Sequence, residues 1–142
     1  MQTVTPEKIA AVMALAPLPH SFSALDDLVR SGLPKSALQK SIARIGRSAE
    51  ERKALLNSII AEATFKRRSA RLTPGESERA ERLARIFATA QYVWDDEDLA
   101  REFLHTPHPL LQDRTPLAVS MTELGARRVE DLLWSLFYGL PV

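Results

Sequence analysis

The sequence contains no cysteine and only 5 glycines in 142 residues. Without cysteine, disulfide bonds and thiolate metal ligands are excluded. Gly75, Gly125 and Gly139 stand singly and form no glycine-rich phosphate-binding loop. No apolar run approaches the roughly 20 residues that a membrane-spanning helix needs. The chain is therefore expected to be globular, with no membrane contact.

The longest apolar stretch near the start, residues 9–16, ends in a small-x-small pattern like that of a signal peptide. The segment before it carries Glu7 and a single lysine, Lys8, and the run is short for such a signal. A cytoplasmic protein is therefore the favoured interpretation.

Side chains suited to catalysis are also scarce. His20, His105 and His108 have no Cys, Asp or Glu at the spacing of metal ligands, and no serine lies in a nucleophile motif. The acidic cluster at residues 95–98 can be read as a magnesium site or as the start of a helix, and capping is the simpler explanation. We expect no enzyme activity, no catalytic residues, no metal and no cofactor.

The near-neutral net charge of +1 hides a division between two halves of the chain. Residues 1–73 carry 12 basic and 6 acidic side chains, whereas residues 74–142 carry 7 basic and 12 acidic ones. Such asymmetry indicates two surfaces with different partners, and a basic half favours a polyanion. The length suits one ordinary domain, or two small ones that share a core.

Almost every segment carries the signals of a helix, and no alternating strand pattern of useful length appears. Thr5-Pro6 and Thr73-Pro74 each combine a capping residue with a first-turn proline, and Glu76 completes a capping box with Thr73. Ser23 is expected to cap a helix that Gly32 ends. The sequence thus predicts an all-α fold, with an N-terminal helix and connector at 1–22 and two helical domains at 23–72 and 73–142.

A basic helix is predicted from about residue 59 to residue 71, after a turn near residues 57–59. It fits the second position of a helix-turn-helix, which enters the DNA major groove. Ile60 and Phe65 would face the preceding helix. The residues then left on the outer surface, where they could clamp phosphates or read guanine, are Thr64, Lys66, Arg67, Arg68 and Arg71. The alternative is a merely solvated basic face.

The last residues of the chain are rich in apolar side chains, and the final charged residue is Asp131. A helical stripe is predicted to belong to the core: Val129, Leu132, Leu133, Leu136 and Phe137. Upstream, Leu99, Phe103, Leu110 and Leu111 are also expected in the core. Trp134, Tyr138, Leu140, Pro141 and Val142 are left over. They either fold back or form a homodimer interface, or they dock into another protein.

Several sequence blocks resemble the Xre/MbcA/ParS-type antitoxins of RES–Xre toxin–antitoxin operons. The blocks are LTPGESER at 72–79, RLAR at 82–85, residues 100–104, TPL at 115–117, TELGA at 122–126 and residues 129–139. Thr64-Phe65-Lys66-Arg67-Arg68 stands where the family has a threonine-x-x-arginine-arginine stretch. His105-Thr106-Pro107-His108 departs from the family's more usual proline-asparagine turn.

The resemblance implies a two-part protein, with an Xre-like helix-turn-helix domain followed by a small helical toxin-binding domain. It implies a homodimer that binds an NAD-consuming RES-domain toxin and represses its own operon by binding operator DNA. The positions that it assigns to toxin contact are His105, His108, Arg114, Trp134, Tyr138, Gly139, Leu140, Pro141 and Val142. The alternative is a stand-alone helix-turn-helix regulator whose C-terminal domain dimerises or senses a ligand.

Overall fold

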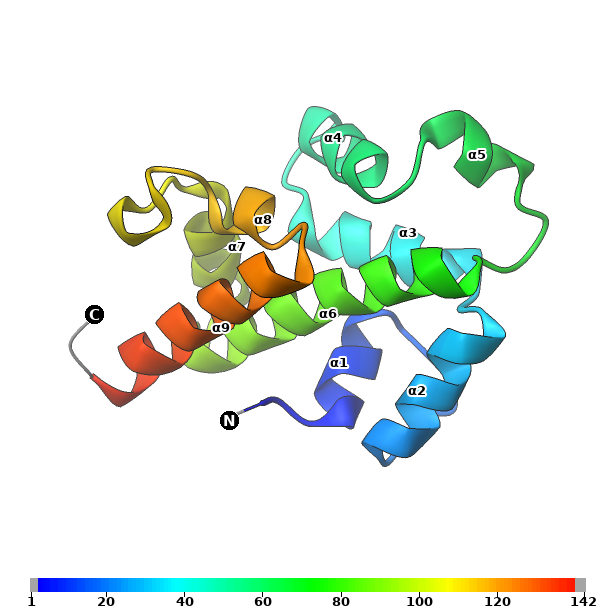
Figure 1. Ribbon diagram of the computed structural model, residues 1–142, viewed down its shortest axis with the longest axis horizontal. Helices are drawn as coiled ribbons and strands as arrows, with labels where there is room; N and C mark the ends of the chain where they lie inside the picture. The colour runs from blue at the N-terminus through cyan, green and yellow to red at the C-terminus, as the bar shows by residue number, and fades with distance from the viewer. Residues whose placement is uncertain (1–2, 140–142) are drawn as a thin grey trace.

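The computed structural model describes residues 3–139, and these form a helical protein without a named strand (Figure 1). Only isolated bridges occur there, between Pro34 and Arg71 and between His108 and Arg114. The helices are α1 (Pro6–Val12), α2 (Phe22–Ser31), α3 (Lys35–Ile45), α4 (Ala49–Ile59), α5 (Glu62–Arg67), α6 (Pro74–Trp94), α7 (Glu97–His105), the 3-10 turn η1 (Pro109–Leu111), α8 (Pro116–Val119) and α9 (Glu123–Tyr138). The all-α prediction is confirmed.

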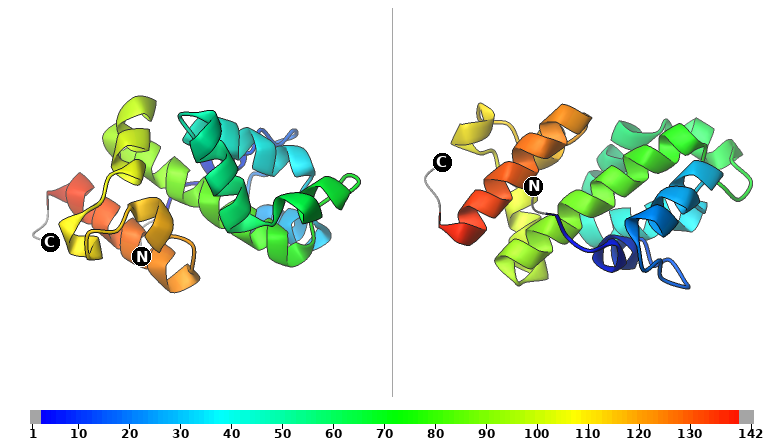
Figure 2. Two further views of the ribbon diagram at one scale, coloured as in Figure 1. Left: turned by 90° about the horizontal axis from the view of Figure 1, so that it is seen from above. Right: turned by 60° about the horizontal axis from the view of Figure 1, so that its bottom comes forward.

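Helix α6 is the central element of the fold. It runs along the long axis of the molecule and contacts α1, α2, α3 and α4 as well as α7 and α9 (Figures 1 and 2). The predicted capping box at its start is present, because Thr73 Oγ1 accepts from Glu76 N and the Glu76 carboxylate accepts from Thr73 N. Its side chains Ile86 and Phe87 are completely buried. One continuous hydrophobic core extends from Val4 to Trp134.

The N-terminal residues belong to this core. Thr5 caps α1 as predicted, and Ile9, Val12 and Met13 are buried in the shared core. In α2 the cap differs from the prediction, because Ser21 accepts from Ala24 N and Ser23 lies inside the helix. Gly32 ends α2 with a φ of 97°, the left-handed region that favours glycine.

Helix α7 is attached to the end of α3. Arg101 Nη1 donates to the carbonyl oxygen of Arg44 at 2.9 Å, and His105 Nε2 lies 2.9 Å from the carbonyl oxygen of Ile45. Arg44 in turn pairs with Glu97 of α7 at 3.1 Å. The last carbonyls of a helix lack partners within the helix, so basic side chains at this end are stabilising. This contact joins the first half of the chain to the second.

Helix α5 and the C-terminal end of α9 lie at opposite ends of the long axis of the molecule (Figures 1 and 2). Within residues 3–139, no helix is long and apolar enough to cross a membrane.

Candidate functional site

Helices α4 and α5 are the two successive helices of the predicted helix-turn-helix, but α4 continues to Ile59, so the turn lies at residues 60–61 and not at residues 57–59 as predicted. Ile59, Ile60 and Phe65 are buried, as expected for residues that hold the two helices onto the core. The turn contains no glycine; instead, Asn57 Oδ1 accepts from Glu62 N at 3.3 Å and bridges from α4 to the start of α5. Arg79 of α6 donates to the carbonyl oxygen of Ile59 at 2.8 Å. The two helices are thus fixed to each other and to α6.

Helix α5 is held mainly through Phe65. The Lys35 Nζ atom lies 4.6 Å from the centre of the Phe65 ring and donates to the carbonyl oxygen of Arg68 at 3.0 Å. This ammonium therefore combines a cation–π contact with a cap on the end of α5. With six residues and no side-chain N-cap, α5 depends on these contacts for its position.

The predicted length of the basic helix is wrong. It ends at Arg67, four residues before the predicted end at Arg71. The chain after it is extended and pairs with the start of α3, because Lys35 N donates to Ala70 O at 3.0 Å and Leu72 N donates to Leu33 O at 2.8 Å. These long-range backbone bonds replace the helical ones that the local sequence favours.

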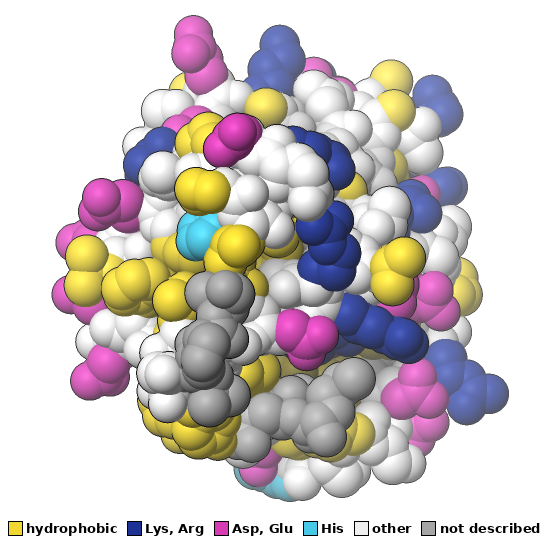
Figure 3. Space-filling model, turned by 60° about the vertical axis from the view of Figure 1, so that its left-hand side comes forward, with side chains coloured by type: hydrophobic (Ala, Val, Ile, Leu, Met, Phe, Trp, Pro, Cys, Tyr) yellow, Lys and Arg dark blue, Asp and Glu magenta, His cyan; other side chains and the backbone are white. Residues whose placement is uncertain are grey.

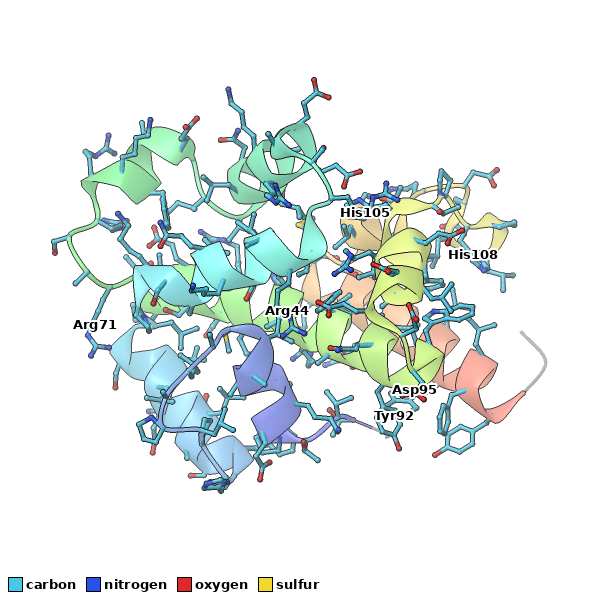
Figure 4. The ribbon with its side chains drawn as sticks, turned by 180° about the vertical axis from the view of Figure 1, so that it is seen from behind. Arg44, Arg71, Tyr92, Asp95, His105 and His108 are labelled. Carbon is cyan, nitrogen blue, oxygen red and sulfur yellow. The ribbon has the colours of Figure 1, made fainter. Side chains whose placement is uncertain are left out.

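The five predicted DNA-contact residues consequently divide into two groups. Lys66 and Arg67 are exposed on α5 and Thr64 is half-buried; Arg67 Nη2 donates to Thr64 Oγ1 at 3.2 Å. The Arg68 guanidinium makes two hydrogen bonds with the buried Glu76 carboxylate, at 3.1 and 2.7 Å, and holds the pKa of Glu76 below its ordinary value. Arg71 is exposed on the loop after α5, where Nη1 donates to Gly32 O at 2.7 Å (Figure 4).

The two histidines assigned to toxin contact occupy different environments. Only 11% of the His105 side chain is exposed, and its ring is directed to the Ile45 carbonyl and the Glu51 carboxylate (3.6 Å) at the α3–α4 turn (Figure 4). His108 lies in the outer loop, where its Nδ1 atom accepts from Leu110 N at 3.1 Å. Arg114 is exposed in the same loop, and its carbonyl accepts from His108 N at 3.1 Å.

At the end of α9, the buried residues differ from those that the sequence predicts. Val129, Leu132 and Leu133 are buried as predicted, but Leu136 and Phe137 are 38% and 43% exposed. Trp134, predicted to be left over, is 7% exposed and lies in the core. The centre of its ring lies 5.5 Å from the centre of the Tyr92 ring and 5.6 Å from the centre of the Phe137 ring.

The remaining predicted contact positions follow Trp134 in the sequence, and the Tyr138 ring packs against the Phe137 ring with centres 5.1 Å apart. Tyr138 is 53% exposed, as expected, and Gly139 ends the helix with a φ of 65°. Leu140, Pro141 and Val142 lie outside the described residues.

An apolar groove was not predicted from the sequence. It has a volume of about 330 Å³ and lies where the end of α6, α7, the following loop and α9 meet. Leu99, expected in the core, is 46% exposed and lines it, together with Trp94, Phe103 and Leu136. Leu110 was also predicted as core and is 44% exposed, whereas Phe103 and Leu111 are buried as predicted. The amphipathic spacing of the α7 residues is the sequence pattern that could have indicated this groove, but Leu99 lies at the border of the apolar stripe.

The acidic cluster has a local structural role. Asp96 caps α7 by accepting from Leu99 N at 2.8 Å, which confirms the capping interpretation for this residue. Among residues 3–139, no group of three or more His, Cys, Asp or Glu side chains is placed to hold a metal ion.

Two family models match successive parts of the chain. An Xre-like helix-turn-helix domain of antitoxins matches residues 24–85, and the C-terminal toxin-binding domain of Xre/MbcA/ParS antitoxins matches residues 89–139. The two matches meet within α6, which thus runs from one domain into the other. A comparison with curated proteins gave no match. From the two adjoining matches and the helical architecture that fits both, this chain belongs to the Xre/MbcA/ParS-type antitoxins.

Proposed function

We propose that this chain neutralises a RES-type, NAD-degrading toxin through its C-terminal domain and represses its own operon through α4 and α5. It acts by stoichiometric binding in the cytoplasm, without catalysis, and as a homodimer. The observation that carries the proposal is that the two matched domains share α6, while α5 and the end of α9 lie at opposite ends of the molecule (Figure 1). One molecule can therefore engage DNA and toxin through separate surfaces.

The DNA-binding role is assigned first to Thr64, Lys66 and Arg67. Lys66 and Arg67 are exposed on α5, while buried Phe65 holds the helix against the core. Arg68 and Arg71 hold the ends of the loop after α5 through Glu76 and the Gly32 carbonyl. Their contribution to operator binding is therefore mainly to position α5, and Arg71 is also free to reach a phosphate with its remaining donors.

The toxin-binding role is assigned first to half-buried His108 and to the exposed positions Arg114, Tyr138 and Gly139. Leu140, Pro141 and Val142 remain proposed contacts from the sequence. His105 and Trp134 are mostly buried, so they are proposed to position α7 and α9 respectively. The boundary proposed from the sequence at residue 73 and the start of the toxin-binding match at residue 89 both place these positions in the second domain.

The proposal is tested by co-expression with the RES toxin gene predicted beside this one. Growth should be rescued by the wild-type chain, and purified protein should bind the DNA upstream of its own gene. Replacing Lys66 and Arg67 together with alanine should weaken that DNA binding and reduce its salt dependence, while leaving rescue intact.

The matched control is the replacement of Arg127 and Arg128 with alanine, because these adjacent exposed cations lie on α9. Equal loss of DNA binding in both double variants would contradict the assignment to α5. If no toxic neighbour exists and DNA binding responds to no partner, the chain is a stand-alone regulator.

A further inference from the structure

Among the predicted contact residues that the structure describes, His108 alone lines the apolar groove beside α7. Leu99 and Phe103 from α7, Trp94 from the end of α6 and Leu136 from α9 supply its apolar walls. Contiguous exposed apolar side chains of this kind mark interaction surfaces.

The rim of the groove is acidic. Glu102 lines it, and Asp95 and Asp96 are exposed between Trp94 and Leu99, whereas Asp98 pairs with Arg101. The neighbouring cation, Arg101, is 20% exposed, and its guanidinium contacts the Arg44 carbonyl, Glu97 and Asp98 and does not line the groove. In Figure 3 hydrophobic side chains gather on this end of the molecule with acidic side chains along one edge. The local potential therefore favours a cationic neighbour.

The two faces of α7 have different tasks. Glu97, Arg101 and His105 follow one another at intervals of four residues and face α3. Leu99, Glu102, Phe103 and Thr106 lie on the other side and line the groove. The contacts with α3 hold α7 by the face opposite to the groove, so the groove is preformed. Binding of an incoming side chain therefore costs little conformational entropy in this chain.

We infer that this groove receives an apolar side chain, flanked by lysine or arginine, from the toxin; this assignment rests on the proposed function. The groove is small, which suits a single aromatic or aliphatic anchor of an interface. DNA is disfavoured by the acidic rim. A second copy of this chain docked about a two-fold axis through the groove would bring two identical acidic rims together.

The test replaces Leu99 with glutamine in the full chain and measures affinity for the purified RES toxin. The matched control is Leu124→Gln, because Leu124 is also an exposed leucine in the first turn of a helix and is 70% exposed. We expect Leu99→Gln to weaken toxin binding about 10-fold or more and Leu124→Gln to leave it unchanged. Glu102→Gln should mainly slow association and reduce its dependence on salt.

Wild-type affinity in both Leu99→Gln and Glu102→Gln would overturn the groove assignment while leaving the proposed function intact. Absence of toxin binding by the unaltered chain would overturn both. Dissociation of a toxin-free dimer by Leu99→Gln would identify a second copy as the occupant and overturn the inference.

A further variant, truncated after Gly139, distinguishes the chain's own last residues from the toxin. If truncation and Leu99→Gln reduce the free energy of toxin binding additively, the groove is an independent toxin contact, as inferred. If Leu99→Gln has no effect in the truncated chain, the groove serves the tail and the inference falls.

Discussion

Replacing Phe65 with alanine should separate DNA binding from toxin binding. Phe65 is 6% exposed and is the one buried side chain in the six residues of α5. Truncation of a buried phenylalanine to alanine costs about 3–5 kcal/mol. A helix this short has almost no stability of its own, so the loss should fall first on the docking of α5.

The apparent operator affinity falls in proportion to the fraction of molecules with α5 docked, and each 1.4 kcal/mol is about tenfold. The docked fraction falls only by the part of this cost that exceeds the free energy with which α5 is docked in the unaltered chain. We therefore expect operator binding to weaken about 10- to 100-fold, less than the full cost would give, by mobility shift or calorimetry. Toxin binding should remain near the wild-type value, because α5, which carries Phe65, lies at the end of the molecule opposite to the end of α9 (Figure 1).

Phe65→Leu is the control, because it keeps an apolar side chain and should cost about 1 kcal/mol. Unchanged operator affinity in Phe65→Ala would refute the role assigned to α5. Equal loss of operator and toxin binding would mean that the substitution unfolds the whole chain, and it would refute the local character of the effect.

Three further predictions concern stability and acid titration. Gly125→Ala should destabilise the protein, because the new Cβ would lie 1.8 Å from the Val119 carbonyl oxygen; a gain in urea midpoint would contradict this. Ser77→Ala should cost about 1–3 kcal/mol in urea denaturation, because Ser77 Oγ accepts from the buried Leu33 N at 2.8 Å; Ser36→Ala, on the exposed side of α3, should be neutral. Hydrogen bonds from Arg47 lower the pKa of Glu51 to about 2, which an NMR titration of the carboxyl carbon should detect. Because the pKa of Glu51 is lower in the folded chain than in the unfolded chain, this carboxylate contributes its full stabilisation above pH 4.5 and loses it as the pH falls toward 2. Glu51→Gln should therefore make the free energy of unfolding less dependent on pH in this acid range.

Helix starts were predictable from the sequence because the signals are local. Thr5, Thr73 and Thr122 each cap the helix that the sequence assigns to them. The end of α5 was not predictable in this way. The residues after Arg67 have helical propensity, but their backbone groups bond to Leu33 and Lys35, which are more than 30 positions away. A long-range contact of this kind overrides local preference and leaves no mark in the local pattern.

The misassignment at the end of α9 has a geometric cause. Helical spacing correctly places Leu132, Leu133 and Leu136 on one stripe, but α9 and α6 cross, so the contacting side drifts around α9 (Figure 1). Trp134 is thereby covered by Tyr92, and Leu136 is left at the edge of the groove. The same crossing creates the groove, which no one-dimensional pattern describes.

The proposed function requires that the C-terminal domain binds and inhibits a toxin. The most direct measurement titrates the full-length chain into the purified RES toxin and follows NAD consumption. We expect a sharp end point at a fixed molar ratio, which the Lys66 and Arg67 double alanine variant should reproduce. Undiminished NAD consumption at any excess of this chain would contradict the proposed antitoxin function.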